Sequence, residues 1–507
     1  VSNKDNKMLE INLQAYLDYD KTFGKHNLKG LLGYSQLYNQ YRILGASRKD
    51  LPNNNSLGEI NAGDENTQKT EGNQVEYALR SVFGRINYTF DNKYLLEANL
   101  RYDGTSRFPK DNRFGAFPSF SAGWRISEEG FFNVPWIDNL KLRASWGQLG
   151  NQEIGDYAFY NTYVFGQNYT FGNLLTPGIS INSKMANSII TWEKTNQVDV
   201  GVDLDAFNGK LNFTGDFFIK NTHDILLALP IPDIVGVTPP TQNAGKVRNT
   251  GLELQLGHNN QVNDFRYFAT FNFSYVHNEI TDLSGGDTPG RSVGDPINNI
   301  YGYVCDGIFN SQEEIDAHPK QIWDAKPGDL IYRDLNNDNV VNEEDRKSLG
   351  TYFPKINFGL RLGFEYKNFD FSALMQGAGM VKDMVANEVN KAFYNGGKVT
   401  EYHLDRWTPD NLDASYPRLS MKDSKKNWET STFWVQNASY LKMRNMQLGY
   451  SIPKQLISGS GISRLRVYFS ADNLFTITGF DGIDPEAGNN YYYPLTRNYS
   501  FGVNLSF

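Results

Sequence analysis

Residues 334–345, with the sequence DLNNDNVVNEED, carry the side chains of this chain best suited to binding a metal ion. A calcium-binding EF-hand loop holds its ion with oxygen atoms from positions 1, 3, 5, 7, 9 and 12. The residues at those positions are Asp334, Asn336, Asp338, Val340 through its carbonyl, Asn342 and Asp345. Hard oxygen ligands at this spacing predict Ca²⁺, with stiffening of a loop as its role.

Two positions depart from the EF-hand pattern. Asn339 stands where glycine is usual, although asparagine tolerates the left-handed backbone conformation required there. Asp345 is shorter than the glutamate that usually binds through both oxygens. The alternative is therefore an Asx-rich surface turn without a metal.

No catalytic set is recognisable elsewhere. The six histidines, His223, His258 and His318 among them, are far apart in sequence and lack metal-binding spacing. Neither a GxSxG elbow nor a glycine-rich phosphate loop followed by a helix is present. The single cysteine, Cys305, excludes an intrachain disulfide framework. The sequence thus predicts that the protein is not an enzyme.

The elements that position these residues are strands, and residues 198–219 give the pattern. Val198, Val200, Val202 and Leu204 alternate with polar residues, which is the period of two of a β-strand. Asn208-Gly209 then provides a tight hairpin turn, and a second alternating strand follows. The predicted hairpin has one apolar and one polar face.

This pattern recurs through the chain with alternating short and long connections. The long loops are predicted at 45–73, 150–188, 226–249, 279–354 and 380–432, the last with a helical stretch at 382–394. A β-bulge is predicted at Arg444-Asn445, where the apolar alternation shifts by one residue.

The chain lacks a run of about 18 apolar residues, so any membrane crossing must use strands. We predict an all-β fold, a transmembrane antiparallel β-barrel contributing about fifteen strands, because such barrels keep their long loops on the external side. A soluble β-sandwich has no reason to do so. An odd number of strands cannot close an antiparallel barrel, and the chain starts VSNKDNK, so further strands are expected from upstream sequence. The net charge of −8 argues against nucleic acid as a partner.

Several long blocks of the chain, in order, resemble the SusC/RagA family of TonB-linked outer-membrane proteins. They are NYTFDNKYLLEANLRYDGTSRF (87–108), LKLRASWGQLGNQEIGDYAFY (140–160), ITWEKTNQVDVGVDLDAFNGKL (190–211), NAGKVRNTGLELQLG (243–257), GDLIYRDLNNDNVVNEEDRKSLG (328–350), YLKMRNMQLGYSIP (440–453) and SADNLFTITGFDGIDPE (470–486). The resemblance implies a barrel of about 22 strands around an N-terminal plug. It also implies a SusD-like surface lipoprotein that captures glycan or peptide, and coupling to the TonB complex. Residues 1–507 would be the C-terminal portion, without the plug, the TonB box and about seven strands.

The resemblance predicts an active importer of oligosaccharides or peptides in the outer membrane of a Gram-negative cell. Its partners would be the lipoprotein, the TonB complex, the remaining barrel and plug, and the lipid bilayer, and it is compatible with a dimer of transporter–lipoprotein pairs. An outer-membrane barrel enzyme and a passive porin are the alternatives. Loops 157–171 and 489–493 carry aromatic and amide side chains that could contact solute or simply pack the loops.

The last strand is predicted to end at Phe507. In the barrels that this chain resembles, a terminal aromatic residue is the signal for outer-membrane insertion and lies at the periplasmic end. This places the C-terminus in the periplasm and the long loops, including 279–354 and 380–432, outside the cell. The alternative role of Phe507 is to anchor the strand at the membrane interface.

Overall fold

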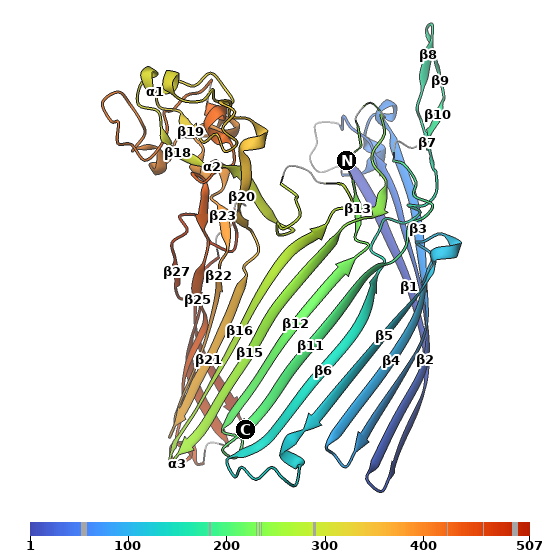
Figure 1. Cartoon of the computed structure of the whole chain (residues 1–507), viewed down its shortest axis with the longest axis vertical. Coiled ribbons are helices and arrows are strands. Elements are labelled where there is room, and N and C mark those ends of the chain that lie inside the picture. The colour runs from blue at the N-terminus through green and yellow to red at the C-terminus, as the bar shows by residue number, and fades with distance from the viewer. Residues whose placement is uncertain are drawn as a thin grey trace. The chain divides into compact units, whose positions relative to one another are not determined.

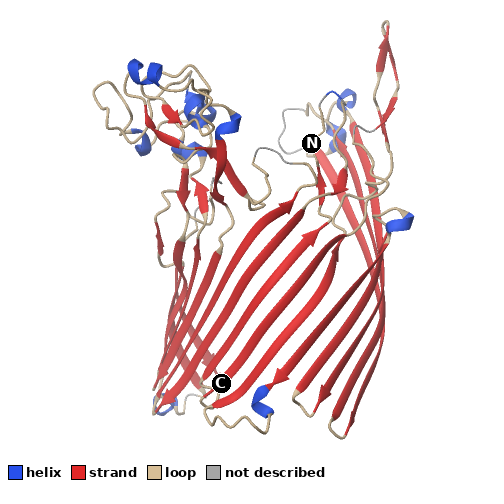
Figure 2. Cartoon of the chain, in the orientation of Figure 1, coloured by secondary structure: helices blue, strands red, loops and turns tan. Residues whose placement is uncertain are grey.

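The computed structural model describes residues 1–51, 58–181, 184–229, 231–232, 234, 236–286, 290–422, 424–459, 461–488 and 495–507. Strands dominate these ranges, and the few helices are short (Figure 2). None of the helices within them is long and apolar enough to cross a membrane.

One antiparallel sheet takes up fifteen strands in almost sequential order (Figure 1). Along the sheet these are β1 (Ser2–Phe23), β2 (His26–Ser47), β3 (Lys69–Phe90), β4 (Tyr94–Thr105), β5 (Phe114–Arg125), β6 (Ile137–Asn151), β11 (Glu193–Ala206), β12 (Leu211–His223), β15 (Lys246–Val262), β16 (Phe265–Asp282), β21 (Ile356–Tyr366), β22 (Phe369–Gly379), β25 (Tyr440–Ser451), β26 (Arg464–Asp472) and β28 (Asn498–Ser506). A short strand, β27 (Thr476–Thr478), pairs with β25. The predicted all-β class and the strand number are confirmed.

The β11–β12 turn contains residues that tolerate a positive φ. The β11–β12 turn has φ values of 60° at Asn208 and 72° at Gly209, as predicted for this hairpin. The bulge predicted at Arg444-Asn445 is confirmed, because the pairing of β22 with β25 shifts between Leu374 and Met375 at that level.

Two local predictions are wrong. The loop predicted at 45–73 is shorter, since β2 continues to Ser47 and β3 starts at Lys69. Its polar residues form a regular ladder with the neighbouring strand, for example Asn73 with Ile43. The helix predicted at 382–394 is reduced to α2 (Asn387–Asn390), because β23 (Lys382–Met384) pairs with β24 (Val435–Asn437).

The two faces of the sheet differ as the alternation predicts. Val198 and Val200 of β11 are 47% and 53% exposed, so no protein core covers them. Polar side chains such as Ser81 of β3 and Arg466 of β26 are buried. We call the face that carries Ser81 and Arg466 the polar face and the opposite face the apolar face.

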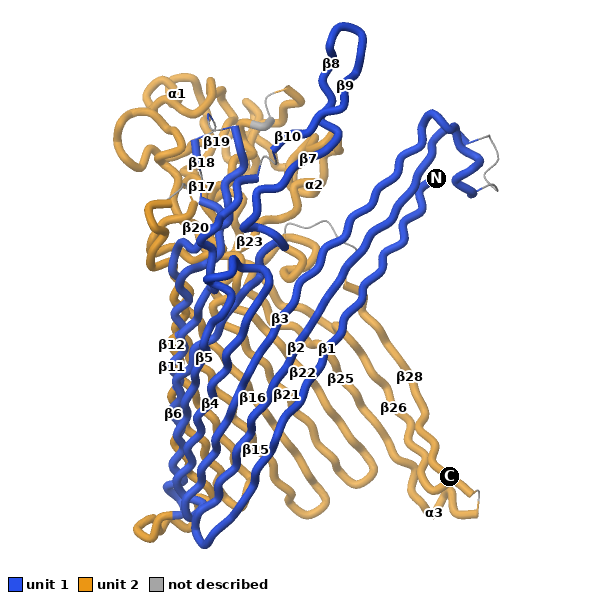
Figure 3. The backbone as a smooth tube through the Cα atoms, turned by 90° about the vertical axis from the view of Figure 1, so that its right-hand side faces the viewer, with its two compact units in different colours: residues 1–128, 143–199, 220–246 blue, residues 129–142, 200–219, 247–507 orange. Residues whose placement is uncertain are grey.

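The chain forms two compact units (Figure 3). Unit 1 comprises residues 1–128, 143–199 and 220–246, and unit 2 comprises 129–142, 200–219 and 247–507. Unit 1 has a small core in which Phe108 and Phe117 meet the Trp192 ring at centroid distances of 5.3 and 5.2 Å. Unit 2 contains the two longest loops, which follow β16 and β22.

The loops add short paired strands and single helical turns. The pairs are β7 (Tyr163–Phe165) with β10 (Ile179–Ile181), β8 (Tyr169–Phe171) with β9 (Leu174–Thr176), β13 (Leu226–Ala228) with β14 (Thr241–Asn243), β17 (Asn299–Tyr303) with β20 (Arg346–Thr351), and β18 (Cys305–Ile308) with β19 (Leu330–Tyr332). The helices are α1 (Gln312–Ala317), α3 (Lys454–Ile457) and the 3-10 turns η1 (Ile60–Ala62), η2 (Glu65–Thr67), η3 (Lys110–Asn112), η4 (Ile126–Glu128), η6 (Glu343–Asp345), η7 (Tyr394–Gly396), η8 (Glu401–His403) and η9 (Ser424–Trp428).

Candidate functional site

The two longest loops fold together around a shared core, and we call residues 299–351 and 380–439 the loop domain. The first loop contributes Tyr303, Leu330, Tyr332 and Val341 to this core, and the second contributes Tyr416 and Trp434. All six side chains are nearly inaccessible to solvent. The loop domain is therefore a packed structure rather than a pair of independent loops.

A buried ion pair joins the two loops. Arg418 Nε donates to Asp329 Oδ1 at 2.6 Å, and its Nη2 donates to Oδ2 at 3.2 Å. Asn427 donates to the same carboxylate at 3.1 Å and accepts the Leu330 backbone N–H at 2.9 Å. Because the Asp329 side chain is only 4% exposed, the paired guanidinium and amide replace the water that this charge loses.

The predicted calcium loop 334–345 lies in the loop domain. Val341, at the centre of the loop, packs into the core, and its N–H donates to the Lys320 carbonyl at 2.8 Å. Asn339 has φ of 68°, the left-handed conformation expected of the residue that replaces glycine. The loop is therefore held in place from its middle.

Each predicted ligand of this loop takes part in a local hydrogen bond. The Asp334 carboxylate accepts the N–H groups of Asn337 and Asn339. The Asn336 side chain accepts the Asp338 N–H, and the Asp338 side chain accepts the Val340 N–H. The Asn342 side chain accepts the Glu344 N–H and donates to the Val340 carbonyl at 3.5 Å, while the Asp345 carboxylate accepts the N–H groups of Leu335 and Asn342. Asp345 is fully buried and forms a capping box with Asn342 at η6.

These contacts bear on whether the residues fit Ca²⁺. Each ionised carboxylate oxygen that accepts one N–H keeps a further lone pair, so the donor chemistry remains suitable. In the described part of the chain, no three acidic, His or Cys side chains already surround a common point. Ion binding would therefore have to draw Asp334, Asp338 and Asp345 closer together.

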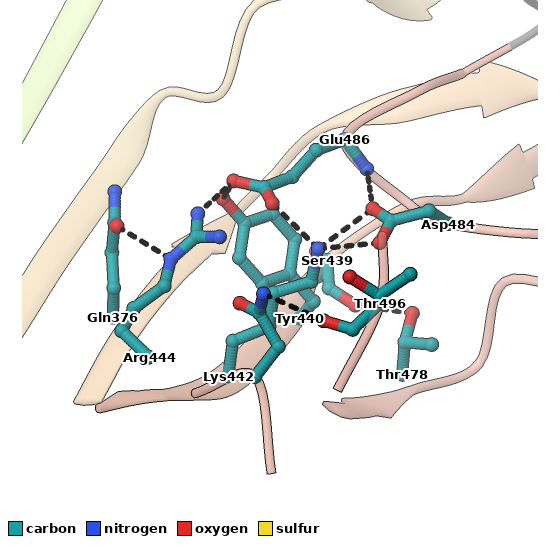
Figure 4. Close-up of polar contacts among 10 residues, drawn as sticks. Gln376, Ser439, Tyr440, Lys442, Arg444, Thr478, Asp484, Glu486 and Thr496 are labelled. Carbon is teal, nitrogen blue, oxygen red and sulfur yellow. Dashed lines mark hydrogen bonds and ion pairs between the residues drawn. The ribbon is translucent and has the colours of Figure 1, made fainter. Parts of the chain in front are cut away.

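A second polar cluster lies at one end of β25 (Figure 4). Lys442 is 2% exposed, and its Nζ donates to Asp484 Oδ1 at 2.7 Å, Asp484 Oδ2 at 2.8 Å and Glu486 Oε2 at 2.5 Å. Tyr440 donates to Glu486 Oε1 at 2.7 Å, and Arg444 also donates to that oxygen. The cluster fastens residues 479–488, which we call the latch, to the sheet.

The latch is also fastened to the loop domain. Gln436 Nε2 donates to Asp481 Oδ2 at 3.0 Å, and its Oε1 accepts the Asp481 N–H at 3.0 Å. Burial alone would raise the pKa of the Glu486 carboxyl, but hydrogen bonds from Lys442 and Arg444 outweigh it and lower the pKa below its usual range. Glu486 is therefore held as an anion.

The polar face of unit 2 has a cavity of about 480 Å³ beside this cluster. Its lining residues come from β12, β15, β16, β21 and β22, and those on the polar face include Thr214, Asp216, Glu253, Gln255, Asn272, Ser274, Asn357, Gly359, Leu374 and Gln376. Gln376 joins the two features, because its Oε1 accepts a hydrogen bond of 2.9 Å from Arg444 Nε.

Sequence reasoning missed both the latch and the cavity. Lys442 was visible as a charge inside a strand, which is a weak sign of a buried partner. Of the loops suggested for solute contact, 489–493 lies outside the described residues. In the other, Phe159 packs against the core of unit 1, whereas Tyr163 and Phe165 are 68% and 75% exposed.

The sequence of this chain matches a known protein family. Residues 2–474 match the family model described as TonB dependent receptor-like, beta-barrel. The chain belongs to this family. TonB-dependent receptors of this kind are transporters of the outer membrane rather than enzymes, which agrees with the exposed apolar face of the sheet.

Two curated relatives and one solved structure place the chain within the TonB-dependent receptors. TonB-dependent receptor P3 of Formosa agariphila is 30% identical over 97% of this chain and 52% of its own length. TonB-dependent receptor SusC of Bacteroides thetaiotaomicron is 32% identical over 86% of this chain and 44% of its own. The solved RagAB peptide transporter matches with a TM-score of 0.86 and 28% identity, over all of this chain and 56% of that one. The predicted SusC/RagA resemblance is confirmed, and the chain spans about half the length of these relatives.

Proposed function

We propose that this chain is the C-terminal barrel portion of a TonB-dependent importer that carries oligosaccharides or peptides across the outer membrane. The observation that carries the proposal is the family match over residues 2–474, together with the similarity to SusC and to the RagAB peptide transporter. The sheet supports it, because one face is apolar and exposed while the other holds polar groups and a cavity.

The remaining barrel completes the proposed importer. In the sheet order, β1 and β28 are the two end strands, and unpaired backbone groups cannot remain in lipid. We propose that upstream strands pair with both, that an upstream plug lies in the lumen, and that this upstream part contacts the TonB complex. The polar face then lines the lumen, and the apolar face contacts the bilayer.

The proposed orientation follows from the same barrel. The loop domain and the latch lie outside the cell, Phe507 lies at the periplasmic end, and a SusD-like lipoprotein covers the external side. Two such transporter–lipoprotein pairs would form the dimer that the family resemblance allows.

Purification of the tagged full-length protein in a mild detergent should recover a surface lipoprotein. Protease added to intact cells should cut the long loops and spare the C-terminus.

Within the loop domain, we propose that Asp334, Asn336, Asp338, the Val340 carbonyl, Asn342 and Asp345 bind Ca²⁺. The spacing and the left-handed Asn339 support this proposal. The ion would stiffen a loop whose centre is already anchored by Val341.

Uptake measurements test the importer directly. Deletion of the full-length gene should abolish uptake of at least one defined oligosaccharide or peptide by the native host, and loss of a working TonB complex should have the same effect. Uptake that persists without TonB would identify a passive porin. Cleavage of the solute by the purified protein would identify a barrel enzyme.

A further inference from the structure

We infer that the cavity on the polar face of β12, β15, β16, β21 and β22 is a binding site for a solute that is rich in hydroxyl or amide groups and carries no negative charge. The inference rests on the proposed function, because it takes the polar face to line a transport lumen. It goes beyond that function by assigning a site and a ligand chemistry to named wall residues.

The shape of the site follows from strand pairing. Asn272 of β16 lies opposite Gly359 of β21, and Gly359 lies opposite Gln376 of β22. Neighbouring strands are about 4.8 Å apart, so the two amides stand about 10 Å apart on either side of a residue without a side chain. In the next row, Ser274 lies opposite Asn357. Gly359 thus forms the floor of a trough with hydrogen-bonding groups on its sides.

Four polar side chains of this trough lack hydrogen-bond partners within the described part of the protein. In the residues that the structure describes, the side chains of Gln255, Asn272, Ser274 and Asn357 make no hydrogen bond with the protein. Gln255, Asn272 and Asn357 are exposed and Ser274 is half-buried, so these side chains are open to solvent. Elsewhere on the polar face of unit 2, Asn139 and Asn212 both donate to Asp205, at 3.2 and 2.7 Å. The trough therefore presents donors and acceptors that a ligand could take over from water.

Gln376 also presents a hydrogen-bonding group to the trough. Arg444 occupies its Oε1, and Glu486 holds Arg444 in turn. The carbonyl oxygen of Gln376 is therefore directed toward β25, and its NH₂ group remains available as a donor. The latch cluster thus fixes one amide of the trough, which lowers the entropy cost of binding.

A second cavity extends the trough along the same strands. It has a volume of about 290 Å³, and its lining includes Asn249 of β15, Val276 and Asn278 of β16, and Lys355 before β21. Val276 and Asn278 continue the alternation of Asn272 and Ser274, so both cavities lie on one face. The second cavity therefore lies between the trough and the loop after β16, and much of its lining is apolar, with Val276, Ile297 and Phe353.

The lining also indicates the charge of the ligand. Among the described residues that line the 480 Å³ cavity there is no Lys, Arg or His, whereas amide and hydroxyl side chains recur and Asp216 and Glu253 are acidic. A polyanion would find no counter-charge there, and an uncharged hydroxyl- or amide-bearing chain would find several hydrogen bonds. Sugar hydroxyls and peptide groups share this chemistry.

A cysteine placed on the floor of the trough tests the inference in the full-length transporter. Gly359→Cys is tolerable, since a Cβ there would meet only the Met375 carbonyl oxygen at 3.8 Å. In a Cys305→Ser background, the rate of reaction with N-ethylmaleimide is measured alone, with maltoheptaose, and with an N-acetylated, C-amidated tetra-alanine. Ser292→Cys, at an exposed position of the loop after β16, is the matched control.

We expect Gly359→Cys to react and to be protected by one of the two probes, which identifies a sugar or a peptide source. Addition of Asn272→Ala and Asn357→Ala should weaken this protection by about tenfold while the reaction without probe is unchanged. If Ser292→Cys reacts and Gly359→Cys does not, the upstream part of the protein covers the trough and the inference is wrong. Reaction without protection by either probe also overturns it. Because labelling needs no TonB coupling, these failures are distinct from failure of the importer in uptake assays.

Discussion

Lys442 Nζ lies 2.5 Å from Glu486 Oε2, although the two residues are 44 positions apart in the chain. The side chain of Lys442 is 2% exposed and that of Glu486 is 27% exposed, so the ammonium group is buried while one edge of its partner reaches solvent. A buried ammonium group is stable only when it is paired, and here the carboxylates of Asp484 and Glu486 both form ion pairs with it. This ion pair links the latch to the sheet.

Replacement of Lys442 should release the latch. In Lys442→Met, the carboxylates of Asp484 and Glu486 remain side by side and Glu486 keeps its contacts with Arg444 and Tyr440, which should cost about 3 kcal/mol in local stability. We expect faster proteolysis within residues 479–488 and faster hydrogen exchange there, with β1–β5 unchanged. Lys347→Met, at an exposed position of β20, is the control. Equal protection of the latch in both variants would show that Lys442 does not hold it.

The latch should also loosen in acid. The pKa of Glu486 is lower in the folded protein than its value of about 4.3 in an unfolded chain, so the folded state favours the ionised form. The stabilisation is complete above the unfolded pKa and is lost as the pH falls through the folded pKa. The protection of the latch amides, measured relative to their intrinsic exchange rate at each pH, should therefore fall below about pH 4. In Glu486→Gln, the latch amides should exchange faster at pH 7, and their protection should depend less on pH. A variant whose latch keeps the wild-type pH profile would contradict this assignment.

The sequence predicts the sheet well because strand alternation is a local property. Val198 and Val200 identify the apolar face of β11 before any contact is known, and Asn208-Gly209 identifies its turn. The start of β3 at Lys69 is not predictable in this way, since its polar residues are held by backbone pairing with β2 rather than by their own pattern. The helix expected at 382–394 is shortened because Lys382–Met384 pairs with Val435–Asn437, a strand about 50 residues further along the chain.

The candidate sites were predictable to different degrees. The loop 334–345 is continuous in sequence, so its spacing is visible without a fold. The Lys442 cluster and the trough bring together residues from distant strands and loops, and neither the partner of Lys442 nor the lack of partners of Asn272 follows from residue type. Register across the sheet is the missing information.

Calcium should protect the loop at 334–345. If the ion draws the carboxylates together, millimolar CaCl₂ should slow proteolysis between Asp334 and Asp345, and a chelator should reverse the effect. Asp334→Ala should abolish the calcium effect, whereas Asp316→Ala, on the nearby helix α1, should retain it. Identical cleavage with and without CaCl₂ would leave the Asx-rich turn as the correct description.

Cys305 should react slowly. Burial raises the pKa of its thiol to about 11, so at pH 7.4 roughly one molecule in several thousand carries the thiolate that reacts. Alkylation by iodoacetamide should be at least about 100-fold slower than at Ser292→Cys in the folded protein, and the two rates should converge in denaturant. Comparable rates before denaturation would show that Cys305 is accessible and ionised.

Deletion of Phe507 tests how the barrel is assembled. It follows the end of β28 and is 88% exposed, so its deletion removes no packed core. If the terminal aromatic ring is read by the insertion machinery, deletion of Phe507 should reduce the amount of heat-modifiable barrel in the outer membrane by about tenfold, while the protein that does assemble keeps its melting temperature. Phe507→Tyr keeps an aromatic ring and should assemble normally. Removal of Phe501, which is 84% exposed on the same strand, by Phe501→Ala serves as the control for loss of one apolar contact. Wild-type assembly after deletion, with a lower melting temperature, would instead assign Phe507 the role of an interfacial anchor.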